Sequence, residues 1–141
     1  MSQADLYDFL RRHRYAVVSS VSASGAPQSA VVGIAVSRDL EIVFDTLTNT
    51  RKYRNLIANP AASVTLWTGE ATAQYEGIAE EPDGPERDRY REIYFESWPD
   101  GRERLSWPGI THLVIRPKWI RYTDFDRSPP QIEEFTFVEP G

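Results

Sequence analysis

The stretch of residues 41–60 constrains the fold more than any other part of the chain. Its first part is rich in alternating and β-branched residues, which predicts a strand that ends near Thr46. After a short turn, Asn49 or Thr50 caps a helix whose apolar residues are spaced three and four positions apart. Pro60 ends that helix, because the residue before a proline is driven away from helical backbone angles. The sequence therefore predicts a strand–turn–helix unit.

The first turn of this helix carries two cations at the end where a helix favours anions. Arg51 and Lys52 follow the cap, although the N-terminal end of a helix dipole is itself positive. Free backbone N–H groups, the Thr50 hydroxyl and the two cations would together form a cradle for phosphate. In the alternative interpretation, Arg51, Lys52 and Arg54 are a solvated charged face, which is the usual meaning of such a run.

Composition limits the classes of function that the chain can serve. The chain has 141 residues, which favours one domain, and its net charge of −5 argues against a general nucleic-acid binder. The absence of cysteine excludes disulfides, thiolate catalysis and cysteine metal sites, and two histidines do not suffice for a histidine-rich metal site. No apolar run approaches membrane-spanning length and no signal peptide begins the chain, so we expect a cytoplasmic protein without nucleic-acid or membrane partners.

The rest of the chain reads mainly as short strands joined by turns. Strands are expected at 15–23, 27–36, 40–46, 62–67, 71–80 and 110–125, the last bent near Pro117, and further helices at 5–14 and 86–97. The first three strands would form an antiparallel meander, and residues 102–108 a loop. Six or so mostly antiparallel strands predict a barrel-like β domain with flanking helices over residues 1–126. Residues 127–141 form a C-terminal tail that packs on a partner subunit or is loosely held.

The central stretch also resembles a known family. Phe44, Thr46, Arg51-Lys52, Asn55-Leu56 and Asn59-Pro60 are similar to the motif of FMN-binding split β-barrel proteins, which include pyridoxamine 5′-phosphate oxidases and general stress proteins. The resemblance extends over residues 15–80 and more weakly to 125. It implies a six-stranded antiparallel split β-barrel, and the general stress protein branch is nearest in length.

The resemblance also implies which residues bind the cofactor. Arg51 and Lys52 would hold the FMN phosphate, Asp45 and Thr46 would contact the flavin from the strand end, and Gln74 would contact it from a later strand. The full set of expected cofactor-binding residues is Val31, Val32, Asp45, Thr46, Thr50, Arg51, Lys52, Gln74 and Trp107. For the threonines the alternative is turn and cap chemistry, for Gln74 an outward-facing polar position, and for Trp107 core or interface packing.

The chain departs from the oxidases in two places. They carry an arginine and a lysine on the flavin-lining strand, where this chain has Ala30 and Ala35. The C-terminal Arg-Leu segment that helps the oxidases to hold pyridoxal phosphate has no evident counterpart. Pyridoxamine 5′-phosphate oxidase activity itself is therefore not expected. No carboxylate pair is evident, and His112 is expected to be a partnered interior or interface residue, so no catalytic side chain is assigned.

These observations lead to three hypotheses of function. The first is an FMN-dependent oxidoreductase that acts on an unknown small substrate, with the cofactor carrying the electron chemistry. The second replaces FMN with a deazaflavin, and the third is a flavin- or haem-binding stress protein without turnover. Because one small barrel offers little concave surface to a flat ring, we expect a homodimer with the cofactor at the subunit interface.

Overall fold

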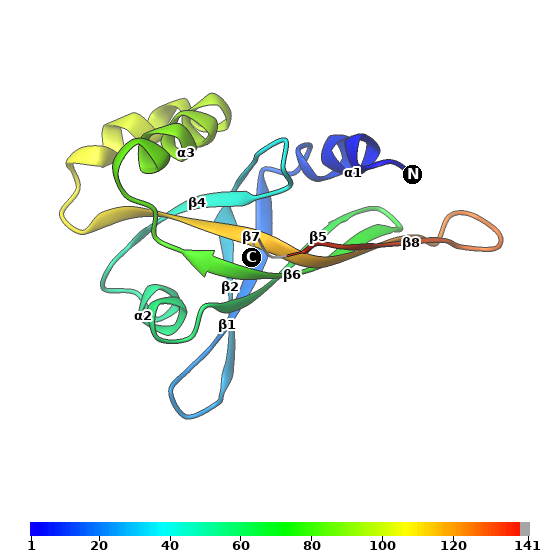
Figure 1. The fold of residues 1–141 in the computed structure, drawn as a ribbon, viewed down its shortest axis with the longest axis horizontal. Helices are drawn as coiled ribbons and strands as arrows, with labels where there is room; N and C mark the ends of the chain where they lie inside the picture. Colours follow the sequence, from blue (N-terminus) through cyan, green and yellow to red (C-terminus); the bar gives the residue numbers. More distant parts are fainter. Residues whose placement is uncertain (139–141) are drawn as a thin grey trace.

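A computed structural model describes residues 1–138 of the chain. They form a sheet of eight strands, three α-helices and one 3-10 helix (Figure 1). The helices are α1 (Gln3–Leu10), α2 (Arg51–Ala58), α3 (Gly84–Ser97) and the 3-10 helix η1 (Pro99–Ser106). The strands are β1 (Tyr15–Val21), β2 (Pro27–Gly33), β3 (Ala35–Val36), β4 (Ile42–Leu47), β5 (Ala61–Thr68), β6 (Ala71–Glu80), β7 (Ile110–Asp124) and β8 (Gln131–Thr136). Among these residues, no helix has the length and apolar character needed to cross a membrane.

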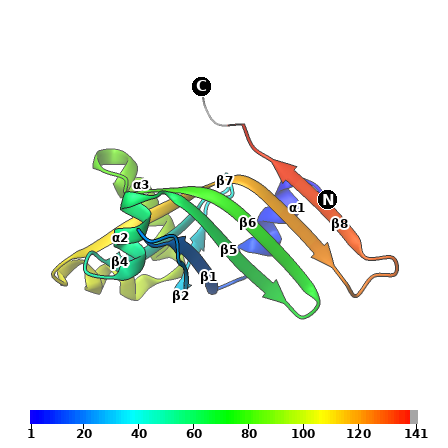
Figure 2. The same cartoon turned by 90° about the horizontal axis from the view of Figure 1, so that it is seen from below.

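The antiparallel sheet is curled, and its two end strands, β2 and β3, follow each other directly in the chain. The strand order is β2-β1-β5-β6-β7-β4-β3, and Figure 2 shows β5, β6, β7 and β8 side by side. The end strands β2 and β3 are consecutive, separated only by Ile34, whose N–H donates to the carbonyl oxygen of Arg14 instead of to a neighbouring strand. The expected strand 27–36 is therefore broken in two, and the mainly antiparallel β architecture with flanking helices is confirmed as a split barrel.

Alternation along the strands sends one set of side chains into the barrel. Val18, Val64, Leu66 and Tyr75 are almost fully buried, while their neighbours along each strand are more exposed. The hydroxyl of Tyr75 donates to the carbonyl oxygens of Leu40 at 2.6 Å and Ile115 at 3.0 Å. Because a buried hydroxyl must find a partner, these bonds allow an aromatic ring to fill the barrel without an orphaned polar atom.

A second apolar cluster lies on the opposite face of β4 and β7, under α3. It consists of Ala35, Val43, Tyr90, Tyr94, Phe95 and Val114. Helix α3 begins at Gly84, two residues before the expected start, with a proline in its first turn, as the fixed backbone angle of proline favours. This helix fixes the position of η1, which follows it directly.

Several expected element boundaries differ from those in the structure. Helix α1 ends at Leu10 and not near Arg14, because His13 places its Nδ1 against the carbonyl oxygens of Phe9 and Leu10. The segment predicted as a loop after α3 is the 3-10 helix η1. The predicted tail contains β8, which pairs with β7 along its outer edge.

The expected bend near Pro117 is a β-bulge. The pairing of β6 with β7 shifts register between Glu76 and Gly77, opposite Pro117. A Cβ atom at Gly77 would lie 2.3 Å from the carbonyl oxygen of Arg116, so only glycine allows the two backbones to approach this closely.

Candidate functional site

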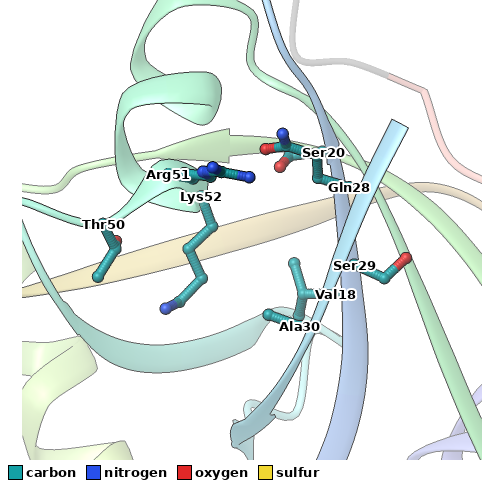
Figure 3. Close-up of a pocket in the computed structure, with 8 residues that line it drawn as sticks. All are labelled: Val18, Ser20, Gln28, Ser29, Ala30, Thr50, Arg51 and Lys52. Atoms are coloured by element: carbon teal, nitrogen blue, oxygen red, sulfur yellow. The ribbon is translucent and has the colours of Figure 1, made fainter. Parts of the chain in front are cut away.

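A cavity of about 390 Å³ lies between the N-terminal end of α2 and the strands β1 and β2 (Figure 3). Its lining residues are Val18, Ser20, Gln28, Ser29, Ala30, Thr50, Arg51 and Lys52. None of them is acidic, although the chain as a whole is acidic. The cavity is therefore a local basic site, suited to a small anion.

Thr50 is the N-cap of α2. Its Oγ1 accepts from the backbone N–H of Tyr53 at 3.3 Å and donates to the carbonyl oxygen of Leu47 at 2.9 Å. The Oγ1 of the buried Thr46 lies 3.2 Å from the Oγ1 of Thr50. These contacts confirm Thr50 as the cap and place Thr46 directly behind it, at the end of β4.

The first turn of α2 offers donors that nothing in residues 1–138 accepts. The backbone N–H groups of Arg51 and Lys52 form no hydrogen bond there, and neither do their side chains. Figure 3 shows the two side chains leaving the helix in different directions, with Arg51 on the side of Ser20 and Gln28. Burial lowers the pKa of Lys52, and the negative charge of Asp45 partly opposes this shift. Two cations, and two backbone N–H groups without an acceptor in the described residues, thus lie at the helix end of the cavity.

Asp45 belongs to a different network, under α3. Its carboxylate accepts from Nε of Arg104 at 2.7 Å and from the hydroxyl of Tyr94 at 3.1 Å. Asp45 comes directly before Thr46 in β4, so its backbone lies near the cavity. Its carboxylate, however, is bonded to Tyr94 and Arg104. Its predicted contact with a flavin stays a prediction.

The remaining predicted residues do not line the cavity. Val31 and Gln74 lie on the outer face of the sheet, in one row across the strands with Val17 and Thr65 between them. Val32 points into the barrel core, and Trp107 is half exposed directly after η1. Their contacts with a cofactor stay predictions, and any contact with Val32 would have to involve its backbone.

The sequence patterns gave no role at the site to Ser20 or Gln28, and Asn55 was named only as part of the family motif. Nδ2 of Asn55 donates to Oγ of Ser20 at 3.1 Å and to Oε1 of Gln28 at 2.7 Å, which ties α2 to β1 and β2. Alternation could have placed Ser20 with Val18 and Gln28 with Ala30 on the inner faces of their strands. Nothing in the local sequence indicates that the helix would close over these two positions.

Residues 1–138 contain no group of three or more histidine, aspartate or glutamate side chains arranged to hold a metal ion.

A family model described as pyridoxamine 5′-phosphate oxidase matches residues 3–124, which is most of the chain. The chain belongs to this family. The match includes α2 and its two cations, so the cavity lies within the part of the chain that the family shares. Among curated proteins, none matches the sequence.

Solved structures with the same fold include both flavin and haem proteins. A haem-binding protein from Mycobacterium smegmatis has a TM-score of 0.82 and 17% identity over 95% of this chain, which spans 57% of that protein. A pyridoxamine 5′-phosphate oxidase-related, FMN-binding protein from Nostoc punctiforme has a TM-score of 0.67 and 12% identity over 97% and 93% of the two chains. The haem storage protein of Vibrio cholerae has a TM-score of 0.66 and 15% identity over 83% and 91%. At these identities the similarity shows the shared fold alone.

Proposed function

We propose that this member of the pyridoxamine 5′-phosphate oxidase family binds FMN and is a flavin-dependent oxidoreductase acting on a small substrate. The observation that carries the proposal is that Arg51, Lys52 and two backbone N–H groups without an acceptor in residues 1–138 lie at one end of the cavity. A phosphate dianion would supply the acceptors that these donors lack. Bound FMN would supply the electron chemistry, and the chain would bind and orient it.

The outer face of the sheet is the proposed place for the flavin ring, which would reach it from the cavity around the end strand β2, past the exposed Ser29. Val31 is 68% exposed and shares a row with Gln74, whose amide can both donate to and accept from a flavin. One face of a sheet covers only one side of a flat ring. We therefore propose that a second copy of the chain supplies the other wall.

Exposed apolar side chains on the same face support a homodimer. Tyr15, Val31 and Trp67 are 58%, 68% and 54% exposed, and the strand register places all three on the outer face. Large apolar groups gathered on one face are typical of a protein interface. An isologous dimer through this face would carry two equivalent flavin sites.

A deazaflavin is the second candidate cofactor, because its phosphate would meet the same donors.

Haem is supported less well by the histidines of this chain. The imidazole of His13 has Nε2 at 2.8 Å from the Thr68 hydroxyl and Nδ1 against helix carbonyl groups, and His112 is 1% exposed. Neither ring presents a free nitrogen at the surface to an iron atom.

Cofactor identification tests the proposal directly. The purified protein is denatured and the released small molecules are identified by mass spectrometry, and the apoprotein is then titrated with FMN, a deazaflavin and haemin. We expect FMN to be recovered or to bind at micromolar concentration or below, and bound flavin to be reduced by one member of a panel of reductants and reoxidised by an acceptor. Failure of FMN to bind would refute the proposal. If FMN binds but no reductant in the panel reduces it, the protein is instead a flavin-binding protein without turnover.

A further inference from the structure

The amide of Asn55 determines what Gln28 and Ser20 present to the cavity. An asparagine amide nitrogen carries two hydrogens, and those of Asn55 point to Oγ of Ser20 and Oε1 of Gln28. The oxygen of Gln28 is thereby occupied at 2.7 Å, which leaves its –NH₂ group for the cavity. The oxygen of Ser20 is likewise an acceptor, which leaves its own hydrogen to donate.

These two donors have no acceptor in the part of the chain that the structure describes. Ser20 is 3% exposed, so its hydroxyl cannot rely on bulk water, and Gln28 is partly buried. Both residues line the same cavity as Arg51 and Lys52 (Figure 3). Ala30, on the same face of β2 as Gln28, has only a methyl group, so no long side chain from this neighbouring position covers the glutamine amide.

The lining of the cavity is thus dominated by donors on two walls, which the bonds of Asn55 tie together. One wall is the first turn of α2 with its two cations, and the other is the pair of strand residues Ser20 and Gln28. An occupant that satisfies both walls must carry acceptor oxygens in several directions, as the terminal oxygens of a phosphate monoester do. An apolar group or a cation at this position would leave buried donors unpaired, at a cost in free energy.

We infer that Gln28, oriented by Asn55, donates to the phosphate group of the bound cofactor, and that the hydroxyl of Ser20 does the same. This inference rests on the proposed function, because it takes the phosphate monoester to be that of FMN. Gln28 is then a phosphate ligand, while Asn55 is a positioning residue that fixes the direction of the glutamine amide.

Gln28→Glu separates this role from a structural one. The substitution keeps an oxygen that accepts from Asn55 and replaces only the –NH₂ group, so a purely structural role, with the phosphate bound away from Gln28, predicts only a small loss of affinity from through-space repulsion. A phosphate ligand predicts a much larger loss, because the new carboxylate repels the anion. We expect FMN affinity, measured by quenching of flavin fluorescence, to fall about 10- to 100-fold, since a hydrogen bond to a charged group is lost and repulsion is added. Riboflavin, which lacks the phosphate, should lose less than threefold.

Two further variants complete the experiment. Gln3→Glu makes the same chemical change at an exposed position of α1, which lies away from α2 in both views (Figures 1 and 2), and should leave FMN affinity unchanged. Gln28→Met removes the amide without adding charge, and should weaken FMN binding less than Gln28→Glu; it decides the matter should the glutamate variant fail to fold. The inference is overturned if a folded Gln28→Glu protein binds FMN within threefold of the parent, or loses FMN and riboflavin affinity equally. A parent protein that does not bind FMN would instead refute the proposed function.

Discussion

The guanidinium of Arg104 donates from Nε to the carboxylate of Asp45 at 2.7 Å, across 59 positions of sequence. Both side chains are largely buried, at 19% and 16% exposure, and the hydroxyl of Tyr94 donates to the other carboxylate oxygen. The pair fastens η1 to the end of β4, one residue before Thr46. The end of β4, next to the cavity, is therefore held in place by an ion pair with Arg104, a residue outside the family motif.

Arg104→Gln should destabilise the fold because it leaves the largely buried Asp45 carboxylate without its cation. We expect the free energy of unfolding to fall by about 1–3 kcal/mol. Arg102→Gln is the matched control, because its bidentate pair with Glu92 is more than half exposed and should contribute at most about 1 kcal/mol. Urea denaturation of the three proteins measures both differences. Equal stability of the two variants would contradict a structural role for the Asp45 pair.

Removal of either cation at the start of α2 should weaken FMN binding. Arg51→Ala and Lys52→Ala each delete a charge-assisted hydrogen bond, so affinity should fall about 10- to 100-fold. The fold should persist, because neither side chain bonds to another part of residues 1–138. Arg54→Ala removes a charge from the same helix without touching the cavity and serves as the control. Wild-type affinity in both test variants, by fluorescence titration, would exclude the phosphate cradle.

His112 should make the protein less stable in mild acid. Burial, with the neighbouring charge of Arg91 as a smaller cause, lowers the pKa of this histidine to about 4, and its Nε2 has no hydrogen-bond partner in residues 1–138. Below pH 6.5 the unfolded chain binds a proton that the folded protein refuses until about pH 4, so stability falls across that window as pH decreases. The loss between pH 7 and pH 5 should be about 2 kcal/mol.

His112→Phe tests this assignment, because it keeps the ring that packs edge-on against Tyr94 and Phe95. Urea denaturation at the two pH values should show a smaller loss in the variant than in the parent. The same loss in both proteins would assign the acid sensitivity to other groups.

Gln74 should affect the absorption spectrum and the reduction potential of bound FMN more than it affects FMN affinity. With the phosphate contacts dominating affinity, Gln74→Ala is expected to shift the absorption spectrum or the reduction potential of bound FMN while affinity changes little. Spectroelectrochemical titration of the parent and the variant is the measurement. If the spectrum and the reduction potential are unchanged, Gln74 is an outward-facing polar residue that does not contact the flavin ring.

The FMN-bound protein should be a dimer in solution. Val31→Asp places a charge in the middle of the exposed apolar face and should shift the equilibrium toward monomer and weaken FMN binding together, since a ligand held between subunits stabilises the dimer by linkage. Sedimentation velocity with and without FMN follows both effects. A monomer that retains flavin at micromolar concentration would eliminate the shared site.

Local sequence patterns were enough to predict the strand–turn–helix unit, a cap at Asn49 or Thr50, and the position of Arg51 and Lys52; the structure selects Thr50 as the cap. These features depend on neighbours within a few residues, such as the bond from the Tyr53 N–H to Thr50, and local signals therefore suffice to predict them. The mainly antiparallel barrel was also predictable, because alternation and turns recur along the chain.

The contacts that complete the cavity are tertiary and could not be predicted from local sequence patterns. The bonds from Asn55 to Ser20 and Gln28 span 35 and 27 positions, and the bond from Arg104 to Asp45 spans 59. The strand of β8 was missed because a polar, proline-containing segment gains its order from the free edge of β7 and not from its own propensity. Such contacts depend on which strands become neighbours when the barrel closes, and no local preference of the residues concerned encodes that pairing.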